Sequence, residues 1–281
     1  MDSNSSSDTP SPQPGDSYVR SFARGLEVIR SFSQKAPTQT LSEVAQRTGL
    51  TRAGARRILL TLQALGYVDS DGRQFRLTPR ILDLGFAYLS SMPFWSLAEP
   101  EMESLADEIG ESCSAAVLDG SDVVYVLRVH THKIMRTSLG VGSRLPAYCT
   151  ALGRVLLAGL GEADLRQRLM GSGVQRNTVH TVTDIDELVD RIGEVRQQGW
   201  SLVNQELEEG LISVAAPILN RSGRVVAAIN ISGQVNRTDV QAMQQSMLDR
   251  ARALEPAMRK VAPDTGFSFE TICEVPSFLG S

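Results

Sequence analysis

The chain has 281 residues, 42% of them hydrophobic, and a formal net charge of −4, which allows two globular domains with buried cores. No apolar run approaches the length needed to cross a bilayer, and the polar, acidic start differs from an export signal, so we expect a cytoplasmic protein that contacts no membrane. Cys113, Cys149 and Cys273 are odd in number and far apart, which indicates neither a disulfide framework nor a clustered zinc site.

Both ends of the chain differ in composition from the middle. Residues 1–17 are rich in Ser, Pro and Asp with hardly an apolar side chain, so they cannot repay the entropy of ordering, and we expect a disordered leader. Residues 263–281 form an irregular tail that still carries several apolar side chains. A first helix from about Ser21 to Ser33 places Phe22, Leu26 and Ile29 on one face, which we expect to complete a three-helix core.

Two helices joined by a tight turn follow. Thr40 and Glu43 have the spacing of a capping box, in which each satisfies a free backbone amide at the start of a helix that begins at Leu41. Gly49 can take a left-handed conformation that ends this helix, and Thr51 then caps the next one. The order of helix, tight turn and helix is typical of a helix-turn-helix.

The second helix of this pair carries arginines on one side. Its predicted core stripe consists of Ala55, Ile58, Leu59, Leu62 and Leu65. Arg56 and Arg57 point away from that stripe, and the strands Tyr67–Val68 and Gln74–Leu77 flank an Asp71–Gly72 turn as a hairpin, or wing. The predicted DNA-contacting residues are Ser42, Thr51, Arg52, Ala53, Arg56, Arg57, Arg73 and Arg76.

Arginines on a solvated helix face are common, so the alternative is an ordinary surface. The distribution of charge favours DNA. From Tyr18 to Arg80 there are eleven Lys and Arg against four acidic residues, a balance of +7, which leaves −11 for the rest of the chain. A basic module on an acidic body is what attraction to phosphate requires. We therefore predict a winged helix-turn-helix over residues 18–78.

A connecting helix is predicted over residues 79–92. Thr78 and Pro79 form a cap followed by proline at the first helical position. The apolar side chains that follow spread around much of the circumference, and they are Ile81, Leu82, Leu84, Phe86, Tyr88 and Leu89. A helix of this kind is expected to pack on both sides, against its own domain and against a second subunit.

The remainder, residues 93–262, alternates between helical and strand-like patterns. The strand-like runs are Cys113–Leu118, Val123–Val129, Ile134–Leu139, Trp200–Gln205, Ile212–Leu219 and Val225–Ser232. Asp119–Gly120 and Ser222–Gly223 link neighbours as short hairpins. We therefore predict an α+β chain whose second domain has a six-stranded antiparallel sheet flanked by helices.

Small and polar residues mark a candidate ligand site in this domain. A helix begins near Ala151 and Leu152, and its free amides would suit a carboxylate, although a simple turn and cap is the alternative. Asn230 and Ser232 share one face of an apolar strand, where each needs a ligand or an internal hydrogen bond as partner. Cys149 is most simply explained by packing.

Six segments together form a specific pattern: Tyr18–Ser21, Leu50–Ala53, Gln74–Arg80, Arg144–Tyr148, Gly153–Leu160 and Asn204–Leu207. In these segments the chain resembles the IclR family of bacterial transcriptional regulators, and most of all the branch that controls the β-ketoadipate pathway, the protocatechuate and 4-hydroxybenzoate regulators. The resemblance implies a winged helix-turn-helix, a linker helix that helps to dimerise, and a C-terminal effector domain similar to the GAF fold. It also implies homodimers or homotetramers that bind double-stranded operator DNA.

The resemblance further implies an effector site. In relatives that sense small oxo-acids, the ligand carboxylate meets backbone amides at the positions of Ala151 and Leu152. The side chains implied beside it are Ser213, Asn230 and Ser232. An aspartate of such relatives falls on Val203 and a serine on Asn230, which indicates an acid with a less polar body. Met135 and Tyr148 are expected to line that space, with Arg128 or Arg136 as a cation.

We therefore expect a regulator, acting as an activator, of genes for aromatic-acid catabolism that senses a small aromatic or dicarboxylic acid. It would need no cofactor or metal and would not be an enzyme, and RNA polymerase is a further partner to consider. One alternative is a DNA-binding module fused to an enzyme that uses Cys149 or a carboxylate near Glu206. Another is an architectural DNA-binding protein without an effector.

Overall fold

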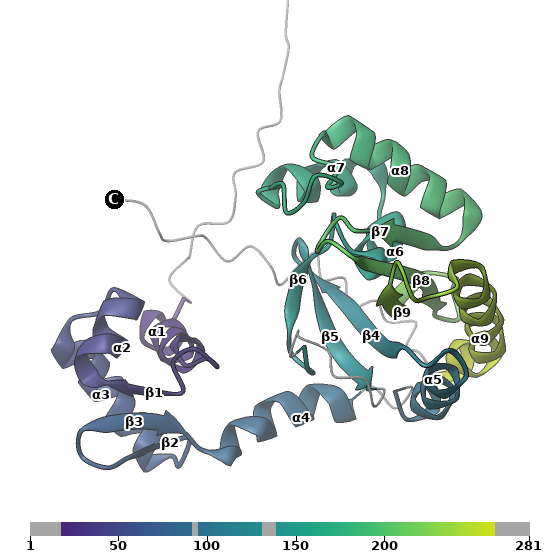
Figure 1. Ribbon diagram of the computed structural model, residues 1–281. Coiled ribbons are helices and arrows are strands. Elements are labelled where there is room, and N and C mark those ends of the chain that lie inside the picture. Colours follow the sequence, from purple (N-terminus) through teal and green to yellow (C-terminus); the bar gives the residue numbers. More distant parts are fainter. Residues whose placement is uncertain (1–17, 92–94, 131–138, 262–281) are drawn as a thin grey trace, which may run out of the picture. The chain divides into compact units, whose positions relative to one another are not determined.

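A computed structural model describes residues 18–91, 95–130 and 139–261 of the chain. The chain divides into two compact units, Met1–Ser91 and Met92–Ser281 (Figure 1). Among the helices so described, none is both long and apolar enough to cross a membrane.

The first unit is a helix-turn-helix with a three-stranded wing. Its helices are α1 (Arg20–Ser31), α2 (Leu41–Thr48), α3 (Arg52–Ala64), the 3-10 turn η1 (Pro79–Ile81) and α4 (Leu82–Ser90). Its strands are β1 (Thr38–Thr40), β2 (Val68–Ser70) and β3 (Gln74–Leu77), in the antiparallel order β1-β3-β2. The predicted hairpin is confirmed, and β1 adds a strand that the sequence analysis did not identify.

The turn between α2 and α3 forms as predicted. Glu43 Oε2 accepts from the Thr40 backbone amide at 2.7 Å, and Thr40 Oγ1 accepts from the Glu43 amide at 3.4 Å, so the capping box is complete. Gly49 ends α2 with φ +65°, a conformation that costs glycine nothing. Thr51 Oγ1 then accepts from the Gly54 amide at 3.1 Å and starts α3.

Of the three residues predicted to face the core from the first helix, Ile29 packs against it, and Phe22 and Leu26 do not. Phe22 and Leu26 are 68% and 44% exposed, whereas Val28 and Phe32 are buried against α2 and α3. At 3.6 residues per turn, the positions that continue the stripe of Val28 and Phe32 towards the N-terminus are Ser21, Arg24 and Gly25, so the large apolar residues lie on its flank. Leu65, the C-cap of α3, was predicted to face the core and is exposed.

The second unit is built on a six-stranded antiparallel sheet in the order β6-β5-β4-β9-β8-β7. The strands are β4 (Ser112–Asp119), β5 (Asp122–Val129), β6 (Arg144–Pro146), β7 (Ser201–Asn204), β8 (Leu211–Leu219) and β9 (Val225–Gln234). The predicted strand number and pairing mode are confirmed. The predicted strand Ile134–Leu139 lies outside the described residues except for Leu139, which is not in a strand, and β6 forms instead within the stretch interpreted as a ligand loop.

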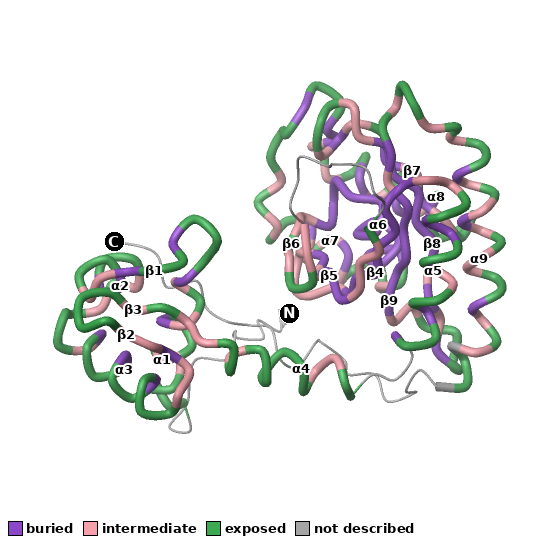
Figure 2. The backbone as a smooth tube through the Cα atoms, turned by 60° about the horizontal axis from the view of Figure 1, so that its bottom comes forward, coloured by how far each residue is buried: buried purple, intermediate pink, exposed green. Residues whose placement is uncertain are grey.

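Helices lie on both faces of this sheet (Figure 1). They are α5 (Trp95–Ile109), α6 (Ala151–Ala158), α7 (Glu162–Gly171), α8 (Ile185–Gln198) and α9 (Val240–Val261). All eight residues of α6 are buried between the sheet and α8, whereas α4 of the first unit has no buried residue (Figure 2). The centre of the second unit is therefore the interface of α6 with β4, β8 and β9.

Candidate DNA-reading helix and buried pocket

The predicted DNA-contacting residues all lie on the surface of the first unit. Thr51, Arg52, Ala53, Arg56 and Arg57 follow one another through the N-cap and first turns of α3, and each is exposed. The others are also exposed, with Ser42 on α2, Arg73 in the turn between β2 and β3, and Arg76 on β3. The structure thus presents one helix N-terminus and a wing carrying arginines.

The arginines of this surface differ in their partners. Arg76 Nε donates to Asp69 Oδ2 at 3.1 Å, and this hydrogen bond holds the pKa of the Asp69 carboxyl below its ordinary value. Within residues 18–91, no ion pair involves Arg52, Arg56, Arg57 or Arg73. These four guanidinium groups are therefore available to phosphate oxygens or base edges, whereas Arg76 is occupied in bracing the wing.

In the second unit, most of the predicted effector residues meet at one small pocket. It is lined by Tyr125, Cys149, Thr150, Ala151, Leu152, Val203, Glu206, Leu207, Leu211, Ser213, Asn230 and Ser232. Its volume is about 30 Å³, enough for a water molecule but not for an aromatic ring. A ligand with an aromatic ring can therefore enter only if side chains that line the pocket move.

Three polar side chains form a hydrogen-bonded cluster on the sheet side of the pocket. Asn230 Nδ2 donates to Ser213 Oγ and to Ser232 Oγ, each at 2.8 Å, and the two hydroxyls lie 2.9 Å apart. Asn230 Oδ1 is buried and has no partner among the described residues. An unpaired buried acceptor costs free energy, so this atom would gain from a donor on a bound molecule.

The opposite side of the pocket is the N-terminus of α6. Thr150 Oγ1 accepts from the Gly153 amide at 3.1 Å and caps the helix. In the described part of the chain, the amides of Ala151 and Leu152 have no hydrogen-bond acceptor, and both residues are almost fully buried. Two free amides at the positive end of a helix dipole suit a carboxylate.

Behind the pocket lies an ion pair that the sequence analysis did not identify. Arg154 Nη2 donates to Glu206 Oε2 at 2.7 Å, and the two side chains are only 3% and 6% exposed. Glu206 itself lines the pocket. Glu206 appeared in the analysis only as a candidate catalytic carboxylate, and Arg154 lies 52 residues away in sequence, so no local pattern could join them.

The two other predicted lining residues are Tyr148, which the structure describes, and Met135, which it does not. Tyr148 is buried, its hydroxyl donates to the Gln175 carbonyl at 2.7 Å, and it does not line the described pocket, so its contact with an effector stays a prediction. Its burial raises the pKa of the Tyr148 phenol. Met135 lies outside the described residues.

Of the two candidate cations, the structure describes Arg128 but not Arg136. Arg128 is half-buried, with Nη1 3.4 Å from Ser114 Oγ and its guanidinium 5.9 Å from the centre of the Tyr125 ring. Tyr125 lines the pocket and Arg128 does not. Burial lowers the pKa of Arg128. Tyr125 and Leu211 line the pocket but were not predicted, because Tyr125 lies within a predicted apolar strand and Leu211 directly precedes another.

The thiol of Cys149 has the character of a packing residue. It is fully buried, and burial raises its pKa to about 11. Because the thiolate is the nucleophilic form, a thiol with this pKa is almost entirely protonated and inert near neutral pH. The geometry therefore agrees with the packing interpretation and not with the enzymatic alternative.

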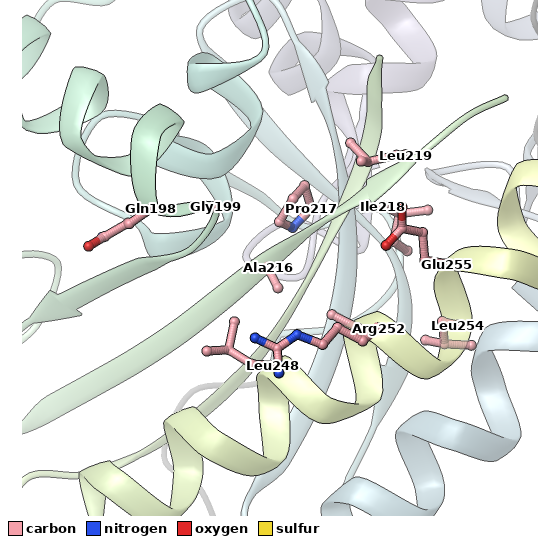
Figure 3. A pocket seen from close by; sticks show the side chains of 11 residues that line it. Gln198, Gly199, Ala216, Pro217, Ile218, Leu219, Leu248, Arg252, Leu254 and Glu255 are labelled. Atoms are coloured by element: carbon pink, nitrogen blue, oxygen red, sulfur yellow. The ribbon is translucent and has the colours of Figure 1, made fainter. Parts of the chain in front are cut away.

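A larger hollow of about 160 Å³ lies elsewhere, between β8, the end of α8 and α9. Figure 3 shows Leu248 and Arg252 of α9 facing Ala216 and Pro217 of β8 across it, with Gln198 at one side. It contains none of the predicted site residues. The smaller pocket is the better binding candidate, because buried polar groups converge on it.

The fold and the two sites together define a DNA-binding regulator with a sensing domain. Residues 21–72 match the model of the IclR helix-turn-helix domain, and residues 86–258 match that of the bacterial transcriptional regulator IclR C-terminal domain. The chain belongs to the IclR family. It is a transcription regulator and not an enzyme.

Two characterised relatives are similar over most of the chain. The Pca regulon regulatory protein of Pseudomonas putida is 42% identical over 232 residues, which cover 82% of this chain and 80% of the relative. The p-hydroxybenzoate hydroxylase transcriptional activator of Acinetobacter baylyi is 33% identical over 249 residues, covering 87% and 92% of the two chains. Both are named as regulators.

The chain is also similar to solved structures of transcriptional regulators. A transcriptional regulator of Rhodococcus sp. RHA1 is 46% identical with a TM-score of 0.76, and the match covers 86% of this chain and 98% of that one. The inducer-binding domain of the PobR transcription factor from Acinetobacter, a double mutant in complex with 3-hydroxybenzoic acid, is 31% identical with a TM-score of 0.54. It matches 58% of this chain and 96% of its own length.

Proposed function

We propose that this protein activates genes for aromatic-acid catabolism and that a small hydroxylated aromatic acid is its effector. The names of the similar regulators support the pathway, since one activates transcription for p-hydroxybenzoate hydroxylase and the structure of another contains 3-hydroxybenzoic acid. A dicarboxylic acid is the second candidate, because the free amides of α6 would donate hydrogen bonds to its carboxylate equally well.

The observation that carries the proposal is the placement of complementary groups on opposite sides of the buried pocket. The free amides of Ala151 and Leu152 would hold the carboxylate, and the unpaired Asn230 Oδ1 would accept a hydrogen bond from a ring hydroxyl. Val203, Leu207 and Leu211 supply apolar surface for the ring between them. Because the pocket holds only about 30 Å³, binding would also move its lining, as a switch requires.

The DNA side of the proposal assigns duplex reading to the N-terminus of α3 and phosphate contact to the wing. Residues 18–78 would bind operator DNA, residues 79–92 would link and dimerise, and residues 93–262 would sense the effector. The exposed apolar residues of α4, Leu82, Leu84 and Phe86, favour a homodimer or a pair of dimers. A cytoplasmic site of action and contact with RNA polymerase follow from the proposed role as activator.

Calorimetric titration of the purified chain with 3- and 4-hydroxybenzoate, protocatechuate, benzoate and β-ketoadipate tests the proposal. We expect binding of at least one acid and a change in operator affinity on its addition. A coupling of roughly 1 to 3 kcal/mol would correspond to a 5- to 150-fold change. Absence of binding across the panel would contradict the proposed effector class, and turnover of any acid followed by NMR would favour the enzymatic alternative.

A further inference from the structure

The carboxylate of Glu206 occupies an unusual place for a site that is to bind acids. It lies on the turn between β7 and β8, lines the buried pocket and is 5% exposed. An anionic ligand brought into the same pocket would be repelled by an uncompensated carboxylate, and the repulsion is strong where water is excluded. The compensation of this charge therefore decides which ligands the pocket accepts.

The compensation comes from α6. Arg154 Nη2 donates to Glu206 Oε2 at 2.7 Å, and Arg154 Nε donates to the Tyr148 carbonyl at 3.0 Å. Burial lowers the pKa of Arg154, which the Glu206 carboxylate opposes, and an arginine remains charged in proteins. The pair therefore presents no net charge to the pocket.

The same pair joins three segments. The Val182 amide donates to Glu206 Oε2 at 3.2 Å, and Thr181 Oγ1 donates to the Glu206 carbonyl at 2.7 Å. On the same turn, Gln205 has φ +60°, and its carbonyl accepts from Thr178 Oγ1 at 2.6 Å. The β7–β8 turn is thus held to α6 and to the loop before α8 by buried hydrogen bonds.

We propose that Arg154 is a positioning residue whose charge neutralises Glu206 and so allows the pocket to accept an organic anion. This inference rests on the proposed function, since it concerns the same pocket. It assigns Arg154 no direct contact with the ligand, and Arg154 is not among the residues that line the pocket.

The proposal predicts that removal of the cation makes acid binding depend on pH. In Arg154→Met, Glu206 is a buried carboxylate without a counter-charge, and such a group avoids the cost by taking up a proton. In the described part of the chain, the titratable and charged groups on the segments packed against it include Arg154 on α6, Tyr148 and Cys149 before it, Arg191 on α8, the exposed His180, and the exposed Glu208 and Glu209 on the same turn.

The test compares wild type, Arg154→Met, Glu206→Gln and the double variant by calorimetric titration with 4-hydroxybenzoate and with neutral 4-hydroxybenzamide. At about pH 8 we expect Arg154→Met to lose on the order of tenfold or more in affinity for the acid and much less for the amide. The loss should recover as the pH falls towards about 5.5, and the double variant should bind the acid nearly as wild type does. Arg166→Met, which breaks the exposed pair with Asp186, is the control.

The outcomes separate this inference from the proposed function. Equal loss of acid and amide in Arg154→Met, or no rescue by Glu206→Gln, would overturn the charge role. If the single variant does not fold, the double variant decides, because its failure to fold as well would show a purely structural role. If wild type binds no acid, the proposed function fails. Thermal unfolding without ligand then still tests the ion pair. As the pH falls, the stability of Arg154→Met should rise relative to that of the double variant, because only Arg154→Met retains the unpaired Glu206 carboxylate.

Discussion

The side-chain amide of Asn230 on β9 donates to Ser213 Oγ on β8 at 2.8 Å, across a register in which Ser213 faces Ser232 and Asn230 faces Ala215. The same amide also donates to Ser232 Oγ at 2.8 Å, so both of its hydrogens are used and its oxygen is left without a partner among the described residues. The oxygen of this side chain is thus an acceptor open to a hydrogen-bond donor.

The first prediction concerns this oxygen. Asn230→Ala should weaken binding of 4-hydroxybenzoate roughly 3- to 10-fold, because a net hydrogen bond contributes about 0.5–1.5 kcal/mol. Benzoate has no hydroxyl and should lose much less. Calorimetric titration of both acids against both proteins gives the interaction energy as a double difference. Equal losses for the two acids would remove Asn230 as the hydroxyl acceptor.

The second prediction concerns the unpaired arginines of α3. Arg56→Ala should weaken binding to operator DNA and reduce the slope of log affinity against log salt by about 1 if the side chain meets phosphate. If it meets guanine instead, the preference for the operator over unrelated DNA should fall by about 1–3 kcal/mol.

Two further variants serve as controls for Arg56→Ala. Arg237→Ala removes an exposed arginine of the second unit and should leave DNA binding unchanged. Arg76→Ala breaks the ion pair with Asp69 and should loosen the wing more than it changes the salt slope. Fluorescence anisotropy at several salt concentrations measures all three, and wild-type binding by Arg56→Ala would exclude Arg56 from the DNA-reading surface.

The third prediction concerns the exposed apolar side of α4. Phe86 is 69% exposed and α4 has no buried residue, so we expect a second copy of the chain to cover it. Phe86→Glu would bury a charge in that interface and should shift the protein from dimer to monomer in sedimentation experiments. Met170, also 69% exposed on α7, gives the control Met170→Glu. An unchanged mass for Phe86→Glu would place the subunit interface elsewhere.

The sequence predicted those features that depend on neighbouring residues. The capping box of Thr40 and Glu43, the glycine that ends α2 and the hairpin at Asp71–Gly72 each involve a few consecutive positions, and the structure has them all. Five strands of the large sheet, β4, β5, β7, β8 and β9, were also predictable from their apolar residues. The family resemblance, not periodicity, supplied Ser213 as a candidate beside Asn230.

The errors arise where distant segments decide the outcome. The core-facing side of α1 depends on which stripe α2 and α3 cover. Phe22 and Leu26 are large and apolar, which favours a core position, but both are exposed. The short strand β6 pairs with the start of β5, with Asp122 opposite Pro146. Its three residues carry no strand pattern of their own. The Arg154–Glu206 pair depends on tertiary structure alone.

The fourth prediction concerns close packing at the start of α6. A Cβ atom at Gly153 would overlap the backbone of Ala147, including its carbonyl oxygen. Backbone cannot yield as a side chain can, so Gly153→Ala should destabilise the second unit by about 2 kcal/mol or more. Gly193 in α8 has open space around it, and Gly193→Ala should stabilise by about 0.5–1 kcal/mol. Urea unfolding followed by Trp fluorescence compares them, and equal effects would refute the packing argument.

The last prediction concerns the pH dependence of the capping box. Hydrogen bonds from the Thr40 amide, and then from its hydroxyl, lower the pKa of the Glu43 carboxyl below 4.5. Because the folded-state pKa is the lower one, the ionised carboxylate stabilises the fold above about pH 4.5, and this contribution disappears as the pH falls through the folded-state pKa. Glu43→Gln should therefore reduce the hydrogen-exchange protection of α2 at neutral pH, with the difference from wild type vanishing in acid. Glu27→Gln, at an exposed site on α1, should show no such difference, and a Glu43→Gln effect that persists below the folded-state pKa would assign the stabilisation to side-chain shape instead of charge.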